Sequence, residues 1–293
     1  GAPKVLSCSW GSTESAFTKS QADAINNSFL KLSSGGYSFF IASGDSGPTL
    51  TSGCNKFDPQ FPATSAYVIA VGGTKIVQGA SAQSSWMHSS GGFSGYIPRP
   101  SYQKDVVEHY LNNASLPSGS DGSVYTTTGR GFPDVAAIGA FEPVLANGSY
   151  QPVGGTSGAC PQFAAIATLI NIHRYQKSLP ALSGLTQTLY QLKNGVGFDV
   201  TEGQTYATNR SGVCGSEYKN GFKAYQGWDA ATGLGAPVFE TLLDQLLNVP
   251  GEQAGKPTKS HHDKRHDHKR DHRRNHKRDH DHKRNHHKRE ENQ

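Results

Sequence analysis

Three short, nearly continuous apolar runs constrain the fold of this chain more than any other feature. They lie at residues 5–10, 37–42 and 67–71, and each leads into a segment that contains glycine. Runs of this length without polar alternation are typical of strands that are covered on both faces of a sheet. The chain therefore contains at least three candidates for buried, neighbouring strands.

The connection between the first two runs has a helical pattern. Ile25, Phe29 and Leu32 fall on one face of a predicted helix, which Gly35-Gly36 ends. Strand, helix and strand in this order predict an α/β fold with a parallel sheet and helices on both faces. Ligands bind such sheets where the strands end at their carboxyl edge, so residues 43–47 and 72–74 are the first candidates for a site.

The rest of the body is less regular. Residues 80–130 are rich in Ser and Gly and predict mainly loops, whereas a helix is predicted from Pro161 and another from Phe239 to Leu247. No initiating Met precedes Gly1, so we expect a processed piece of a longer chain. The length of the body predicts one domain over residues 1–250.

The charge of the chain resides in its C-terminal tail. The 293 residues hold 28 Lys+Arg and 23 Asp+Glu, a net charge of +5. Residues 261–293 hold 12 and 7, so residues 1–260 are neutral (16 − 16 = 0). A neutral body argues against specific nucleic-acid binding, and no apolar run reaches the roughly 18 residues that a membrane span needs. Residues 251–293, almost devoid of apolar side chains, are predicted to be a disordered tail.

Repeated His, Asp, Lys and Arg residues, as in 266–270, suggest two roles for the tail besides that of a solvated extension. It holds ten of the 13 histidines, which gain charge below a pH of about 6.5. Histidines bind transition metals, and Lys/Arg pairs bind anionic surfaces. A solvated, flexible extension is the favoured interpretation of the tail, and binding of polyanions or metal ions is the alternative.

Glycosylation motifs and cysteines indicate the compartment. Sequons occur at Asn26, Asn113, Asn147 and Asn209, which together favour the secretory pathway. The four cysteines allow three complete pairings, and the sequence does not choose among them. Cys8 and Cys160 are expected to be buried free thiols, whereas Cys54 and Cys214 lie in Gly/Ser-rich loops that a disulfide would suit.

The segment Gly154-Gly-Thr-Ser-Gly-Ala-Cys-Pro161 is the strongest catalytic candidate. It places Ser157 in a glycine-rich turn before a helix, where backbone N–H groups and the helix dipole can stabilise an oxyanion. A Gly/Ser loop without chemistry is the alternative. The motif is not the Gly-x-Ser-x-Gly turn of α/β-hydrolases.

A histidine base for this serine is poorly supported. His173 lies 16 residues further along the same predicted helix, which is about 24 Å away. His109 is predicted to be a solvated surface residue. His88 lies near a glycine pair and could line a cleft, but nothing in the sequence places it against Ser157.

Several motifs resemble those of one peptidase family. They are Ser43-Gly-Asp-Ser-Gly47, residues 61–74, Gly91-Gly-Phe-Ser94, Ile97-Pro-Arg-Pro-Ser-Tyr-Gln103, residues 129–137 and Gly155-Thr-Ser157. In this order the chain resembles the sedolisin, or serine-carboxyl, peptidases from about residue 4 to residue 250, and most of all their lysosomal, tripeptide-releasing branch. The resemblance implies a subtilisin-like fold, Ser157 as the nucleophile, Asp45 as the acid of the oxyanion hole, and an acidic vesicle, lysosome or secreted location.

The chemistry of that family explains a serine peptidase without a histidine base. An imidazole is protonated at pH 4–5, whereas a carboxylate with an ordinary pKa of about 4.3 still accepts a proton there. A carboxyl group such as that of Asp45 donates a hydrogen bond to an oxyanion only while it is protonated. The resemblance therefore implies activity at acidic pH on peptide or protein substrates.

The base of the family is absent from this chain. It is a Glu with an Asp four residues later, on a helix before the first strand seen here. The one such pair present, Glu240 and Asp244, is predicted to be a solvated helix face. We expect the Glu/Asp pair on an upstream segment or light chain. The alternative is a non-catalytic sedolisin-like remnant or binding protein. Gly154 and Ala159, which stand where the family usually has serines, leave room for that alternative.

The resemblance also implies a structural calcium ion. Its ligands would be the side chains of Asp199 and Asp229 and the carbonyl groups of Val200, Tyr225 and Gly227. Carboxylates and backbone carbonyls are the oxygen ligands that Ca²⁺ prefers. Tyr225 stands where glycine is usual, which a carbonyl ligand tolerates.

Overall fold

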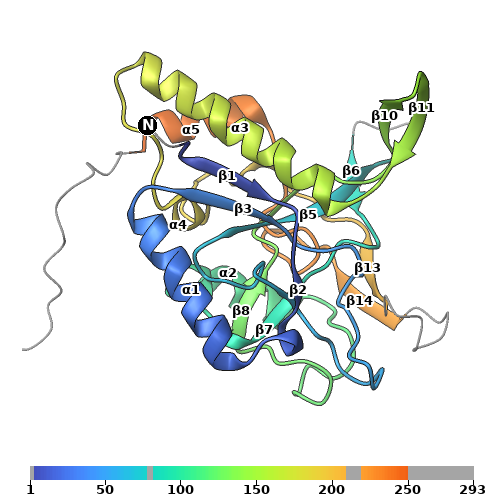
Figure 1. Cartoon of the computed structure of the whole chain (residues 1–293). Helices are drawn as coiled ribbons and strands as arrows, with labels where there is room; N and C mark the ends of the chain where they lie inside the picture. The colour runs from blue at the N-terminus through green and yellow to red at the C-terminus, as the bar shows by residue number, and fades with distance from the viewer. Residues whose placement is uncertain (1–2, 78–81, 209–218, 250–293) are drawn as a thin grey trace, which may run out of the picture. The chain divides into compact units, whose positions relative to one another are not determined.

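A five-stranded sheet forms the centre of the fold in Figure 1. The computed structural model describes residues 3–77, 82–208 and 219–249. Strands β1 (Val5–Cys8), β3 (Ser38–Ala42), β5 (Ile69–Ile76) and β9 (Val135–Ile138) are parallel, and β6 (Gln83–Ser85) pairs antiparallel with the end of β5. The three predicted strands are present, whereas β9 was not among them.

Alternate residues of these strands pack on opposite faces of the sheet. Phe40, Ile69 and Val71 belong to the core cluster under α3 (Thr156–Gln176). Ile41 and Ala70 belong to a second cluster, against which Phe29 of α1 (Lys19–Ser34) packs. Because successive side chains of a strand point to opposite faces, an apolar run fills both cores. The predicted parallel sheet with helices on both faces is confirmed.

Helix α1 begins at a capping box, in which Thr18 and Gln21 satisfy each other's backbone N–H groups. Its packed side differs from the predicted one, because Leu32 is exposed. Asn26 takes the inward position and accepts hydrogen bonds from the Ser65 hydroxyl (2.8 Å) and the Ala66 N–H (3.1 Å). Because a polar side chain that binds the neighbouring loop occupies part of the packed helix face, the pattern of apolar residues does not predict that face correctly.

Residues 80–130 contain more regular structure than predicted. Strand β7 (Gly92–Pro98) pairs with β8 (Gly129–Phe132), and η2 (Ser101–Gln103) leads into α2 (Lys104–Asn113). Glycine and proline in β7 interrupt the alternation of apolar and polar residues by which a strand is predicted. In α2 only Val107 and Tyr110 are buried. Helix α3 begins five residues before the predicted start at Pro161, whereas α5 (Phe239–Leu247) has its predicted bounds.

The remaining elements are short. They are β2 (Ser12–Thr13), η1 (Glu14–Ala16), β4 (Gln60–Phe61), β10 (Glu142–Ala146), β11 (Ser149–Val153), α4 (Leu185–Leu189), β12 (Gly197–Phe198), β13 (Gln204–Ala207), β14 (Lys219–Lys223) and β15 (Ala236–Pro237). No helix of the described residues is long and apolar enough to cross a membrane. The chain divides at residue 254, and the predicted tail at 251–293 lies outside the described residues.

The cysteines follow the prediction in part. Cys8 and Cys160 are free thiols, and Cys160 is buried as expected. Cys8 is exposed, because it ends the edge strand β1. Cys54 is disulfide-bonded, while its predicted partner Cys214 lies outside the described residues.

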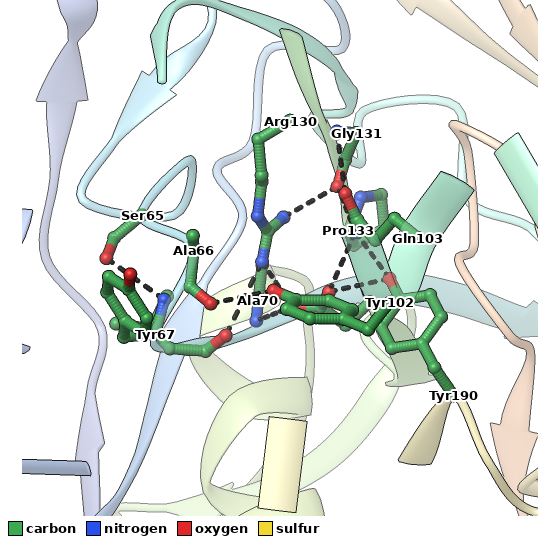
Figure 2. A network of polar contacts seen from close by, with 12 residues as sticks. Ser65, Ala66, Tyr67, Ala70, Tyr102, Gln103, Arg130, Gly131, Pro133 and Tyr190 are labelled. Carbon is green, nitrogen blue, oxygen red and sulfur yellow. Dashed lines mark hydrogen bonds and ion pairs between the residues drawn. The ribbon is translucent and has the colours of Figure 1, made fainter. Parts of the chain in front are cut away.

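A buried ion pair joins the sheet to its surroundings, and Figure 2 shows Arg130 of this pair among the polar groups around it. Arg130 and Asp134 are fully buried, with 2.5 Å between Nη2 and Oδ2. The Asp134 carboxylate also accepts hydrogen bonds from the Ala70 N–H (2.7 Å) and the Tyr190 hydroxyl (2.7 Å). Gln103 completes the network by donating to the Gly131 carbonyl. The turn between β8 and β9 is thus fixed to β5, η2 and the end of α4.

Asp134→Asn is expected to lower the free energy of unfolding by about 3–5 kcal/mol, since it leaves the Arg130 charge buried and unpaired. Urea denaturation followed by circular dichroism measures the change. The control is Asp23→Asn, which breaks the exposed pair with Lys19 and should cost less than about 1 kcal/mol. A similar, small effect of both variants would contradict a structural role for the buried pair.

Candidate active site

Ser157 is the second residue of α3 and is exposed at the start of the helix. Pro161 lies inside this helix and has no N–H to donate, so the Ser157 carbonyl lacks its partner four residues on. The Ser9 hydroxyl, just past β1, donates to that carbonyl instead (3.1 Å). The end of strand β1 is therefore tied directly to the predicted nucleophile.

Asp45 lies at the same helix start, as the resemblance implies. Its Oδ1 accepts hydrogen bonds from the Thr156 N–H (2.7 Å) and the Thr156 hydroxyl (2.8 Å), although the two residues are 111 apart in sequence. Its Oδ2 lies 3.5 Å from the point where a Cβ on Gly155 would stand, and the Ser157 nitrogen lies 3.6 Å from that point. The fold thus brings the predicted nucleophile and the predicted acid together.

Thr156 is the residue that locks this arrangement. Its hydroxyl donates to Asp45 and accepts a hydrogen bond from the Gly44 N–H (3.1 Å). Gly44 has φ 111°, a conformation that side chains rarely adopt, so the loop after β3 can turn back onto α3. The sequence placed Thr156 within a motif but gave it no role.

A carboxylate that the sequence did not single out also lies at this helix start. The Glu142 Oε2 is 2.5 Å from the point where a Cβ on Gly158 would stand, and its Oε1 accepts a hydrogen bond from Gln162. A negative charge is favourable at the N-terminus of a helix. Gly158 therefore leaves room for a carboxylate beside the nucleophile, a long-range relation that no sequence motif carries.

The three histidines of the described residues are placed differently from one another. His109 is exposed on α2, and His173 lies in the last turn of α3, so neither is near Ser157. His88 lines a cavity that Gly154 also lines. Glu240 and Asp244 are exposed on α5, as predicted for a solvated face; α5 contacts the far end of α3, where Arg174 donates to Leu246.

The five predicted calcium ligands lie in and around one loop. The Asp199 Oδ2 accepts from the Gly227 N–H (2.9 Å), and the Asp229 Oδ2 accepts from the Tyr225 N–H (3.0 Å). Val200 is buried beside this loop, and Gly227 has φ 79°. Among the described residues no three His, Cys, Asp or Glu side chains converge on one point, so any cation here would depend on carbonyl oxygens.

Three carboxyl groups share an unusual electrostatic environment. Burial raises the pKa of Glu14, of Asp199 and, to about 7, of Asp229. Hydrogen bonds from neighbouring hydroxyl and N–H groups oppose this shift in pKa without cancelling it. None of the three forms an ion pair with another described residue, so burial dominates.

Known proteins resemble the chain in both sequence and structure. A family model described as "Subtilase family" matches residues 1–235. Tripeptidyl-peptidase 1 of Bos taurus is 38% identical over 252 residues, which cover 84% of this chain and 44% of that protein; the Homo sapiens protein gives the same figures. The chain thus spans less than half the length of these relatives.

A solved structure agrees with these sequence relatives. Pseudomonas sedolisin, described as a serine-carboxyl proteinase, superposes with a TM-score of 0.60 at 25% identity, covering 82% of this chain and 64% of that one. The predicted subtilisin-like fold is therefore confirmed. The chain belongs to the subtilase family and, within it, to the sedolisin or serine-carboxyl peptidases.

Glu14→Gln is expected to raise the melting temperature at pH 7. Burial raises the pKa of Glu14 above its value of 4.5 in the unfolded chain, so the folded state binds this proton more tightly. The resulting contribution to stability is complete below pH 4.5 and is lost as the pH rises through the pKa of the folded state. Glutamine stays neutral, so the gain should shrink towards pH 4. Thermal unfolding at both pH values measures it.

The control is Glu240→Gln, which neutralises an exposed carboxylate and should change the melting temperature little at either pH. A Glu14→Gln chain that is less stable than the native chain at pH 7 would show that the ionised carboxylate is stabilising.

Proposed function

We propose that this chain carries the nucleophile and the oxyanion acid of an acid-acting serine-carboxyl peptidase. The observation that carries the proposal is the Asp45–Thr156 pairing, which sets a carboxyl group beside Ser157 at the N-terminus of α3. A nucleophile, a hydrogen-bond donor for an oxyanion and a helix dipole are the parts that acyl transfer requires.

Each group has one task in this reaction. The Ser157 oxygen attacks the substrate carbonyl carbon while its proton passes to a base, and the tetrahedral oxyanion receives a hydrogen bond from protonated Asp45. The peptide C–N bond then breaks as the base returns the proton to the leaving amine, and water releases the acyl group. Thr156 orients Asp45, and Ser9 holds the Ser157 carbonyl.

The base is proposed to be a Glu/Asp pair that lies outside this chain, on an upstream segment or partner chain. Glu240 and Asp244 are exposed on α5 and contact the wrong end of α3. The alternative is a non-catalytic sedolisin-like protein, and the absence of such a pair from the start of α3 among the described residues favours it. Labelling Ser157 with a fluorophosphonate in the natural protein separates the two, since only an assembled site reacts.

The substrate and the compartment follow from the relatives. Identity of 38% to proteins named tripeptidyl-peptidase 1 supports release of tripeptides from free N-termini. We propose an acidic vesicle, the lysosome or the exterior as its location, which the exposed sequons at Asn113 and Asn147 support. Binding of polyanions or metal ions by the tail stays a prediction, because that segment lies outside the described residues.

Asp45→Asn is expected to retain measurable peptidase activity with a weaker dependence on acid. An amide donates a hydrogen bond at every pH, whereas the carboxyl group does so only when protonated. The measurement is a pH profile of kcat/KM for the protein with its upstream segment. A control, Asp105→Asn at an exposed site on α2, should keep the native profile; an Asp45→Asn profile identical to it would remove Asp45 from this role.

A calcium ion is proposed at Asp199 and Asp229, with the carbonyl groups of Val200, Tyr225 and Gly227. The fit is supported by Asp229, a fully buried carboxylate whose described partners are N–H and hydroxyl donors without a positive charge. A divalent cation supplies the missing charge. The ion would stabilise the loop and take no part in the chemistry.

Chelation with EGTA is expected to lower the melting temperature, because an ion that binds only the folded state stabilises it. The loss is about 2.7 kcal/mol when free calcium had exceeded its Kd 100-fold. Scanning calorimetry with and without EGTA measures it, and an Asp199→Asn chain should show a smaller shift. Equal melting temperatures of the native chain under both conditions would argue against the ion.

A further inference from the structure

The β10–β11 hairpin extends away from the central sheet in Figure 1, and one of its faces is apolar and exposed. Leu145 lies directly opposite Tyr150, and Pro143 lies opposite Pro152, so these four side chains share one face, called here the hairpin face. Leu145 is 60% exposed and Tyr150 is 74% exposed, so no other described residue covers them. Apolar side chains that gather on a surface in this way are typical of a surface that something else covers.

The turn of this hairpin carries one of the four glycosylation motifs. Asn147 and Gly148 form the two-residue loop after the last strand pair, Ala146 with Ser149, and their φ angles of 50° and 77° are those of a type I′ turn. Asn147, Gly148 and Ser149 are exposed, and the Asn147 amide forms no hydrogen bond with another described residue. Because the second residue after the asparagine is a serine, Asn147 presents an accessible acceptor for an N-linked glycan.

The motif at Asn26 has the opposite environment. Its Oδ1 accepts hydrogen bonds from the Ser65 hydroxyl (2.8 Å) and the Ala66 N–H (3.1 Å), and both of these residues are buried. The nitrogen and the oxygen of an amide share one carbon, so a bulky sugar on the Asn26 nitrogen competes with this contact. Turning the amide towards solvent would leave two buried donors without their acceptor, which is costly. The folded chain therefore disfavours a glycan at Asn26.

The motif at Asn113 is exposed but has no apolar face beside it. Asn113 is the last residue of α2, its amide donates to the His109 carbonyl (2.8 Å), and α2 holds none of the exposed large apolar residues of the described chain. The fourth motif, at Asn209, lies outside the described residues. Cys54 is disulfide-bonded, which is typical of chains that fold in an oxidising compartment such as the one in which N-glycans are attached.

We propose that Asn147 carries an N-linked glycan, that Asn26 carries none, and that the glycan covers the hairpin face beside it. The Asn147 amide nitrogen forms a bond to the anomeric carbon of a sugar, and the bond from that carbon to a lipid-diphosphate-linked oligosaccharide donor's phosphate oxygen breaks. The lipid diphosphate leaves with the electron pair of the broken bond, and the nitrogen gives up one proton. The proposal rests on the proposed location in an acidic vesicle, the lysosome or the exterior, and not on the proposed roles of Ser157 and Asp45.

The position of Asn147 suits a covering role. Leu145 lies two residues before it, about 7 Å along a strand, and Tyr150 stands directly opposite Leu145. An N-linked glycan is bulky and solubilising, so a glycan at the turn lies within reach of both side chains. It would keep the exposed hairpin face from associating with other molecules.

The first experiment locates the glycans of the natural protein by mass spectrometry. Peptide-N-glycosidase in water enriched in heavy oxygen removes each N-glycan and converts its asparagine to a labelled aspartate. Label is expected at Asn147 and not at Asn26. A digest without the glycosidase is the control, because the Asn147-Gly148 sequence also deamidates spontaneously. An unlabelled Asn147, or a labelled Asn26, would overturn the assignment.

Asn113 separates the ways in which this experiment can fail. Label at Asn113 without label at Asn147 overturns the site assignment and leaves the proposed location standing. No label at any of the four motifs overturns the glycan and the location together. Neither result touches the peptidase proposal, which the labelling of Ser157 with a fluorophosphonate decides separately.

Ser149→Ala tests the covering role, because it removes the glycosylation motif and keeps Asn147 in its turn. Binding of the apolar dye 1-anilinonaphthalene-8-sulfonate is expected to rise at least about twofold, since the hairpin face becomes accessible. Ser115→Ala is the matched control: it removes the exposed motif at Asn113, where no apolar face lies, and should leave dye binding unchanged.

A rescue identifies the side chains that the glycan covers. Leu145→Thr and Tyr150→Thr, added to the Ser149→Ala chain, should return dye binding to the native level, because threonine is polar and suits a strand. Equal dye binding by the native and Ser149→Ala chains contradicts the covering role, and so does a rise that the two threonines fail to reverse.

Discussion

The buried ion pair of Arg130 and Asp134 is the constraint on which the rest of the fold depends. Removing both charges from water is costly, and the structure offsets this cost with close geometry and further hydrogen bonds. The same turn carries two more contacts, from the Trp228 indole to the Pro133 carbonyl (3.0 Å) and from the Leu234 N–H to the Asp134 carbonyl (2.8 Å). The sheet and the segment that follows the proposed calcium loop therefore share one anchor.

The candidate active site is built at the ends of several strands of this sheet. Ser9 follows β1, Asp45 follows β3, and the turn after β9 leads through the β10–β11 hairpin to Ser157. Helix α3 crosses the sheet and presents its N-terminus at this edge, where backbone N–H groups and the dipole favour negative charge. Pro161 removes one internal hydrogen bond of α3, and that loss is what allows Ser9 to bind the helix.

Sequence reasoning recovered what local patterns encode. Continuous apolar runs predicted β1, β3 and β5. The resemblance to the family implied roles for Ser157 and Asp45, and the structure places both residues at the start of α3. The sequence does not predict contacts between distant residues. Glu142 lies beside Gly158, and Ser9 donates to the Ser157 carbonyl, and no rule of spacing connects these positions. Cys8 was wrongly expected to be buried, because an apolar run alone does not distinguish an edge strand from a central one.

The pH dependence of stability expected here and the proposed acid chemistry would have the same physical origin, the protonation of carboxyl groups. Glu14 and Asp229 are buried without a cationic partner among the described residues, so burial raises the pKa of each and these two groups contribute more to stability as the pH falls. A protonated carboxyl group is also what the proposed oxyanion site requires of Asp45. A calcium ion at Asp229 would oppose this for one group by holding it ionised, so the loop and the site would respond to pH in opposite directions.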